Sequence, residues 1–273
     1  MTSPFSKLVL GLALGLAAGS PLRATVEPAP AESLPSARPG TAASELRSPA
    51  AGPAPALAGE GAAAHASAAA FFSWASATGR GQANEVRQAL AAARNNSAIA
   101  TAFCQQAQDS AGQDLSRALL ALALLGEMRS ASSLPCLKGF LDRPLPEKGT
   151  VVDGEIQERK ALEILQTKAL AGLAYLRTSE TDALVLQAVS SHPSRAVRAG
   201  AVIAYLWNHG SSAEARETLR KAVRQGDSVL IDRPIRSAGQ DPAEYDRQLA
   251  AYLEAHPELE PPPPVREIPG TNR

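Results

Sequence analysis

The chain has 273 residues, with 27 lysines and arginines against 27 aspartates and glutamates, so its formal net charge is zero. That balance argues against a nucleic-acid binder, whose affinity would rest on clustered basic residues. Aromatic residues make up only 4% of the chain, so a core must be built from alanine, leucine and valine, a composition that favours closely packed helices.

Residues 1–24 have the pattern of a secretory signal. Lys7 supplies a positive charge ahead of an uncharged apolar run over residues 8–18, and Gly19, Ser20 and Ala24 offer small residues for cleavage. The run of about 11 residues falls short of the roughly 20 needed to span a bilayer. We expect export to the periplasm or secretion from a bacterium, with no transmembrane segment after cleavage. The alternative is a buried N-terminal helix.

Residues 25–66 are rich in alanine, proline, serine and glycine, and seven prolines fall between positions 28 and 55. Each proline costs about 3 kcal/mol inside a helix. Few large apolar residues are present to offset the entropy of ordering. We expect this segment to be a disordered linker.

Helical character is expected from about Ser67 onward. Phe71, Phe72 and Trp74 place three aromatic side chains within four residues. They can cover the end of a helical stack, or they can form an exposed anchor for a partner protein, because exposed apolar clusters mark interfaces.

The next elements are short helices with recognisable starts. One is expected over residues 84–94, and Ser97 can cap another. Asp114 can cap the first helix of a pair that covers residues 114–141. Prolines and glycines then indicate a loop insertion at 142–154.

Two further helices are expected over residues 155–177 and 179–189, and the segment 192–223 contains the clearest helix pair. Ser194 can start its first helix, whose apolar residues recur at a spacing of about 3.6. Ser211 begins an S-x-x-E capping box for the second helix. Two amphipathic helices cannot bury both apolar faces alone, so the pair needs stacked neighbours.

The tripeptide Ala-Tyr-Leu recurs around Tyr175, Tyr205 and Tyr252, each time near the end of an expected helix. The first two copies lie about 30 residues apart, a period typical of helical solenoids. Tyr175 and Tyr205 are therefore predicted to occupy equivalent structural positions in successive repeats. Asp241 starts the last helix, and residues 257–273 form a proline-rich tail that we expect to be disordered.

The stretch PSRAVRAGAVIAYL, residues 193–206, resembles the HEAT-repeat family, in which a proline precedes Val-Arg, small residues and leucine. Weaker copies occur at 114–141 and 160–190. The resemblance implies an all-α fold over residues 67–256, a right-handed superhelical stack of antiparallel helix pairs. It also implies that Arg198 is structural, and that the protein binds another protein along one face. Repeats of this kind are also similar to those of phycobilin-lyase-like proteins.

The sequence contains no recognisable catalytic, cofactor or metal motif. The four histidines lie apart, and H-E-x-x-H, C-x-x-C, G-x-x-x-x-G-K-[ST] and G-x-S-x-G are all missing from the sequence. We therefore predict no catalytic residue, no metal and no cofactor.

The two cysteines suggest a disulfide, because export would place them in an oxidising compartment. A bond between Cys104 and Cys136 would close a loop of about 33 residues and stabilise the fold by roughly 3–4 kcal/mol. The alternative is a pair of small buried apolar side chains.

These features predict a non-catalytic scaffold or adaptor in the bacterial cell envelope. The partner is expected to be another protein, and nucleic acid is not expected. The competing classes are an enzyme or enzyme-maturation factor of the lyase-like HEAT class, with its site on the concave face, and a structural spacer.

Overall fold

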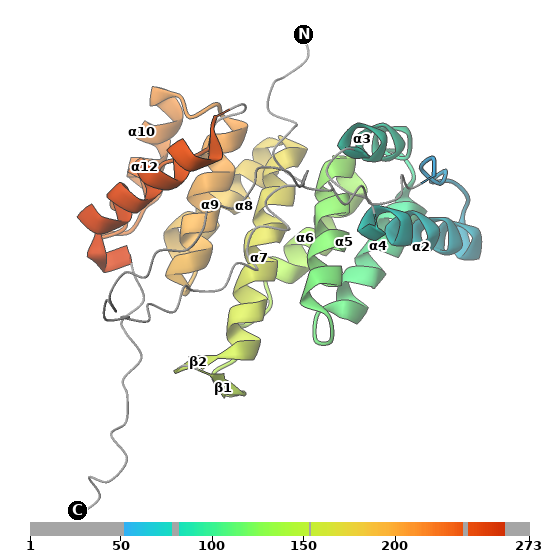
Figure 1. The fold of residues 1–273 in the computed structure, drawn as a ribbon, viewed down its shortest axis with the longest axis horizontal. Coiled ribbons are helices and arrows are strands. Elements are labelled where there is room, and N and C mark those ends of the chain that lie inside the picture. Colours follow the sequence, from blue (N-terminus) through green and yellow to red (C-terminus); the bar gives the residue numbers. More distant parts are fainter. Residues whose placement is uncertain (1–51, 78–81, 153, 237–239, 260–273) are drawn as a thin grey trace, which may run out of the picture.

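The computed structural model describes residues 52–77, 82–152, 154–236 and 240–259 (Figure 1). The expected signal at residues 1–24, the first part of the expected linker and most of the expected tail lie outside these ranges. Across the described ranges, every helix is too short or too polar to span a lipid bilayer.

Helices make up most of the described chain, and the expected all-α class is confirmed. The described ranges contain eleven α-helices: α2 (Gly61–Ala77), α3 (Ala83–Ala92), α4 (Ser97–Ser110), α5 (Leu115–Met128), α6 (Leu134–Leu141), α7 (Gln157–Leu176), α8 (Ser179–Ser191), α9 (Arg195–Asn208), α10 (Ala213–Ala222), α11 (Val229–Asp232) and α12 (Pro242–Ala255). They also contain two 3-10 turns, η3 (Ala131–Ser133) and η4 (Pro257–Leu259), and two short strands, β1 (Val151–Val152) and β2 (Glu155–Ile156).

The helices form a row, which runs from α2 at the right of Figure 1 to α12 at the left. α3, α5, α7 and α9 each contact the next of the four, so they lie side by side in one layer. α4, α6 and α8 form a second layer, and each packs against the first-layer helix that follows it in the chain. Isolated helices of this length are marginal in water, so their stability comes from this mutual packing.

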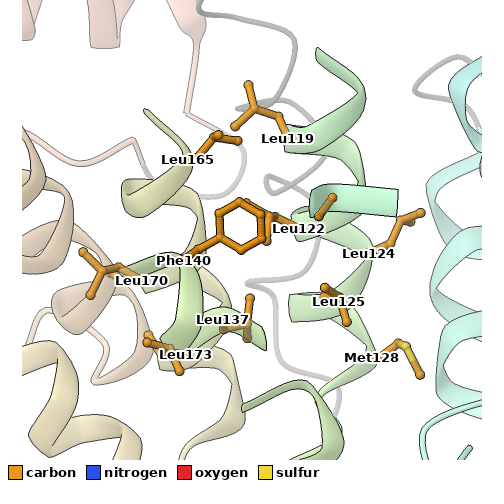
Figure 2. Close-up of a cluster of buried hydrophobic side chains, with 14 of the residues drawn as sticks. Leu119, Leu122, Leu124, Leu125, Met128, Leu137, Phe140, Leu165, Leu170 and Leu173 are labelled. Carbon is orange, nitrogen blue, oxygen red and sulfur yellow. The ribbon is translucent and has the colours of Figure 1, made fainter. Parts of the chain in front are cut away.

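Helix α5 lies at the centre of the core, with ten of its 14 residues buried. It contacts α4 on one side and α7 on the other. Figure 2 shows Phe140 of α6 between Leu122 of α5 and Leu170 of α7. All three side chains are buried, and each contributes about 1.5–3 kcal/mol by leaving water.

The backbones of α5 and α7 approach closely where two glycines face each other. A Cβ added to Gly126 would lie 2.8 Å from the Cα of Gly172, and one added to Gly172 would lie 3.0 Å from a methyl group of Leu137. Any side chain at Gly126 would therefore separate the two helices. The absence of side chains at this crossing allows α6 to pack over it.

Several helix starts agree with the sequence prediction. The side chains of three predicted caps, Asp114, Ser194 and Asp241, each accept a hydrogen bond from a backbone N–H in the first turn of their helix. These acceptors satisfy donors that have no partner inside the helix.

Other predicted caps are wrong by one residue. The side chain of Asn96, not Ser97, caps α4 and accepts from the N–H groups of Ala98 and Ile99 at 3.0 and 3.2 Å. Ser212, not Ser211, caps α10, because Ser211 has a positive φ of 54°. In each case two adjacent residues have side chains that could accept the hydrogen bond from the first helical turn. The backbone conformation of the preceding turn determines which of the two does so.

The structure also corrects the expected start of the helical region. Helix α2 begins at Gly61, earlier than the expected Ser67. The residues before it lie against the helix: the Ser67 hydroxyl donates to the carbonyl of Ala56 at 2.8 Å, and Trp74 Nε1 donates to that of Gly52 at 2.8 Å. Alanine-rich sequence with few prolines after position 55 is compatible with a disordered linker or with a helix. The two hydrogen bonds favour the helix.

The expected loop at 142–154 ends in a short hairpin. Val151 pairs with Ile156 and Val152 with Glu155 in antiparallel register. Gly154 has a φ of 81°, a conformation that glycine adopts without strain. Asp-Gly between two strands is a recognised hairpin signal, so this turn could have been predicted from the sequence.

We expect Gly126→Ala to lower the free energy of unfolding by about 1–3 kcal/mol, because the new methyl group must push α7 away from α5. Gly139→Ala on α6 is the matched control. A Cβ at Gly139 meets nothing within 4 Å, so there the substitution should stabilise the helix by about 0.5–1 kcal/mol. Urea denaturation measures both, and equal effects at the two sites would contradict the close approach.

Candidate functional site

The structure buries the aromatic cluster that the sequence placed near the N-terminal end. Phe71 and Phe72 are 0% and 2% exposed. The Phe71 ring lies 5.4 Å from that of Trp74 and 6.3 Å from that of Phe103 on α4. The two phenylalanines therefore cover the end of the row, and the alternative of an exposed anchor is wrong for them.

Arg198 holds α9 to the turn that precedes α11. Its Nε donates to the carboxylate of buried Asp227 at 2.6 Å, and one terminal nitrogen donates to the carbonyls of His192 and Pro193 at 2.8 and 3.1 Å. Arg195 reaches the same carboxylate at 3.1 Å. A buried carboxylate with two arginine partners is compensated, so these residues join neighbouring turns.

Burial lowers the pKa of His192 beside this network. Its Nδ1 accepts a hydrogen bond from the Ser194 N–H at 3.2 Å, as only a neutral ring can.

The repeated tyrosines lie near the ends of their helices. Tyr205 is buried and stacks on His209 with ring centroids 4.2 Å apart. Tyr175 is partly covered by Arg129, whose guanidinium carbon lies 5.7 Å from the ring centroid. Tyr252 lies 4.5 Å from the ring of His256. The tyrosine and histidine rings pack one helical turn apart at the ends of α9 and α12.

The structure joins Cys104 of α4 to Cys136 of α6 in a disulfide, with their Cα atoms 5.9 Å apart. This bond connects two helices of the second layer. It also closes the segment that contains α5, so the central helix lies inside a covalent loop.

A groove of about 220 Å³ lies between α2 and α4. Its walls include Phe72 and Phe103, and polar groups of His65, Gln106 and Asp109 line it. This volume is below the roughly 300–1,000 Å³ of typical small-molecule sites.

The more distinctive site is a group of charged side chains on α3, α5 and α7 and in the turns that end them. We call it the basic patch; it comprises Arg87, Arg94, Arg129, Lys168 and Arg177. Three of these, Arg129, Lys168 and Arg87, interact electrostatically with Glu127. Arg94 Nε donates to the carbonyl of Met128 at 3.2 Å, and Arg177 Nε donates to Asn208 Oδ1 at 3.4 Å. Arginines after α3, α5 and α7 thus each reach the end of the next first-layer helix.

Arg129 and Arg177 share a backbone conformation. Both follow their helices with a positive φ, 51° and 53°. This left-handed position usually favours glycine. Here an arginine places positive charge next to the negative end of the helix dipole, which stabilises the end by about 0.3–1 kcal/mol.

Glu127 is the acid at the centre of the patch and is only 8% exposed. Burial raises the pKa of its carboxyl, although the charges of Arg129, Lys168 and Arg87 act in the opposite direction. Burial also lowers the pKa of the half-buried Lys168, which the charge of Glu127 opposes. Burial and the charge of Glu127 together raise the pKa of the Tyr175 phenol.

The basic patch is not predicted by the amino-acid sequence alone. Its members lie up to 90 residues apart in the chain, and only the side-by-side packing of α3, α5 and α7 brings them together. The available signal was an arginine after three consecutive first-layer helices, at Arg94, Arg129 and Arg177.

The described residues contain no group of three or more histidine, cysteine, aspartate and glutamate side chains that could hold a metal ion. In comparisons with protein-family models, with curated proteins and with solved structures, no match was found.

Replacing both cysteines by serine should lower the free energy of unfolding by roughly 3–4 kcal/mol, because the loop between them regains its entropy in the unfolded state. Urea denaturation of the oxidised protein and of the double variant gives the difference. A reducing agent should lower the stability of the wild type to that of the variant and leave the variant unchanged. Equal stability of the oxidised protein and the variant would contradict a stabilising crosslink.

Glu127 should make stability depend on pH. Because burial raises its pKa above the ordinary value of 4.5, the folded protein holds the proton more tightly than the unfolded chain. The stabilisation from this group is present below the unfolded pKa and lost as the pH rises through the folded pKa. Relative to Glu127→Gln, the wild type should therefore become less stable from pH 4 to pH 7 in urea denaturation. A difference that stays constant over this range would contradict the burial of the charge.

Proposed function

We propose that this protein is a non-catalytic adaptor of the bacterial cell envelope, which binds another protein through one face of a HEAT-like stack of helices. The observation that supports this most is the two-layer row itself. Side-by-side helices form a long continuous surface, and repeat proteins use such surfaces to bind partners.

The proposed architecture is a HEAT-like α-α solenoid with right-handed superhelical stacking. The alternation of first-layer and second-layer helices from α3 to α10 supports it. The position of Arg198 also supports it, because the arginine of the Val-Arg pair is bonded within the protein and joins neighbouring turns.

The proposed location rests on two independent features. Residues 1–24 have the charge and apolar pattern of a secretory signal. The Cys104–Cys136 disulfide belongs to an oxidising compartment, where such bonds persist.

The way the protein buries its apolar residues limits the kind of binding face. Among the described residues, the exposed large hydrophobic side chains are Val151 and Val152 of the hairpin. A broad apolar docking surface would require more exposed hydrophobic side chains than these two, so polar and charged contacts with a partner are favoured. The basic patch provides such charged groups on the first layer.

Site-specific photo-crosslinking in the native host tests the adaptor role. A crosslinking residue at position 94 or 177, in the turns that end α3 and α7, should form an adduct of defined mass with one envelope protein. Positions 139 and 217, exposed on α6 and α10, are the matched controls and should not form this adduct. A variant lacking residues 1–24 should lose it, because the protein would no longer reach the envelope.

The absence of any protein adduct from all four positions in the exported protein would contradict the adaptor role. An adduct that persists without residues 1–24 would contradict the envelope location and leave the adaptor role standing.

A further inference from the structure

The arginines of two regions of the row differ in how many of their nitrogens bond within the protein. Near α9, Arg198 bonds through Nε and a terminal nitrogen, and Arg224 donates through Nε and a terminal nitrogen to the carbonyls of Ser190 and Ser191. Arg216 gives a terminal nitrogen to the carbonyl of Ile231 at 2.6 Å. These guanidinium groups hold turns together.

In the basic patch, Arg87 donates through Nε to the carbonyl of Ala83 and through a terminal nitrogen to Asn84 Oδ1. The terminal nitrogens of the other three arginines make no hydrogen bond with described residues. Arg94 and Arg177 each use only Nε in hydrogen bonds with described residues, and Arg129 lies against the Tyr175 ring. The two terminal nitrogens of a guanidinium can bind a carboxylate in a bidentate manner even when Nε is already hydrogen-bonded. Three such pairs remain available along one edge.

The charge of the patch is not balanced by the protein. Among the described residues, no carboxylate lies within 4.0 Å of a basic nitrogen of Arg87, Arg94, Arg129, Lys168 or Arg177. Glu127 is a buried acid that interacts electrostatically with Arg129, Lys168 and Arg87. Four arginines of this group therefore lie without a carboxylate in salt-bridge contact, which favours anions at this surface although the total charge of the chain is zero.

Stabilising helix ends does not account for the whole patch. One cation at each C-terminus is enough to complement the helix dipole. Lys168 lies two turns before the end of α7, and Arg87 lies in the middle of α3. These two add charge on the first-layer side, away from the helix ends.

We propose that the basic patch binds an acidic segment of the partner protein, with aspartate or glutamate side chains on Arg94, Arg129 and Arg177. The inference rests on the proposed adaptor function and specifies the chemistry of the partner. Neighbouring packed helices lie about 8–10 Å apart, so the three arginines repeat at about that distance. A polyproline II segment rises about 3.1 Å per residue, so an acid at every third position matches this repeat on one face.

A protein segment fits better than a nucleic acid. A nucleic-acid site draws on many clustered cations, whereas this patch offers three guanidinium ends in a row.

The test uses the full mature chain and a fluorescent peptide with glutamate at every third position, separated by alanine and proline, measured by anisotropy. Arg94→Gln with Arg177→Gln should weaken binding about threefold to tenfold, because two exposed charge contacts are lost. Glu127→Gln should strengthen binding, since it removes the negative charge that interacts with Arg129, Lys168 and Arg87. A gain of this kind cannot come from unfolding.

Arg220→Gln with Lys221→Gln on α10 removes the same charge from a different surface and is the matched control. It should leave the affinity for the peptide unchanged. A peptide of the same composition with its glutamates contiguous should bind more weakly, and added salt should weaken both interactions.

Equal binding of the peptide by the wild type, the Arg94/Arg177 variant and the Glu127 variant would overturn the proposal. So would tighter binding of a single-stranded oligonucleotide of equal charge. If the peptide fails to bind while the envelope crosslink at position 94 or 177 still forms, the acidic-segment inference fails and the adaptor function stands.

Discussion

The close approach of α5 and α7 is the constraint on which the rest of the structure depends. Gly126 and Gly172 face each other without side chains between them, so the two backbones can meet and α6 can cover the crossing. Helix α5 then has neighbours on nearly every side and carries leucine and alanine around its circumference. Because α4 packs on one side of α5 and α7 on the other, this contact joins the N-terminal helices to the C-terminal ones. The Cys104–Cys136 disulfide links the second layer across the same place.

The basic patch is a consequence of that packing. A helix that is covered on most sides also buries its last turn, and Glu127 therefore becomes a buried carboxyl with a raised pKa. The neighbouring helices end at the same level, so arginines after α3, α5 and α7 gather around it. Near α9, Asp227 and backbone carbonyls accept hydrogen bonds from the arginines. The two regions thus carry similar residues, bonded within the protein near α9 and with donors available to a ligand in the basic patch.

The sequence predicted the helical class, most helix positions and several caps, because periodicity and local hydrogen bonding are encoded within a few residues of each other. It failed by one residue where two capping residues were adjacent, as with Asn96 and Ser97. It placed the start of α2 too late, because alanine-rich sequence does not distinguish a helix from a linker without its tertiary contacts. The basic patch could not be predicted from spacing alone. Arg94, Arg129 and Arg177 come together only when the register of α5 against α7 is known, and two glycines in the middle of helices set that register.

Native-state hydrogen exchange of the full mature chain tests most directly whether α5 is the centre of the fold. The amides of α5 should exchange most slowly, with protection equal to the free energy of global unfolding, and those of α4 and α7 should follow closely. Helix α12, which has no buried residue, should exchange much faster. If α5 exchanges as fast as α12, or if α4 and α7 open independently of each other, the central role of the α5–α7 contact is wrong.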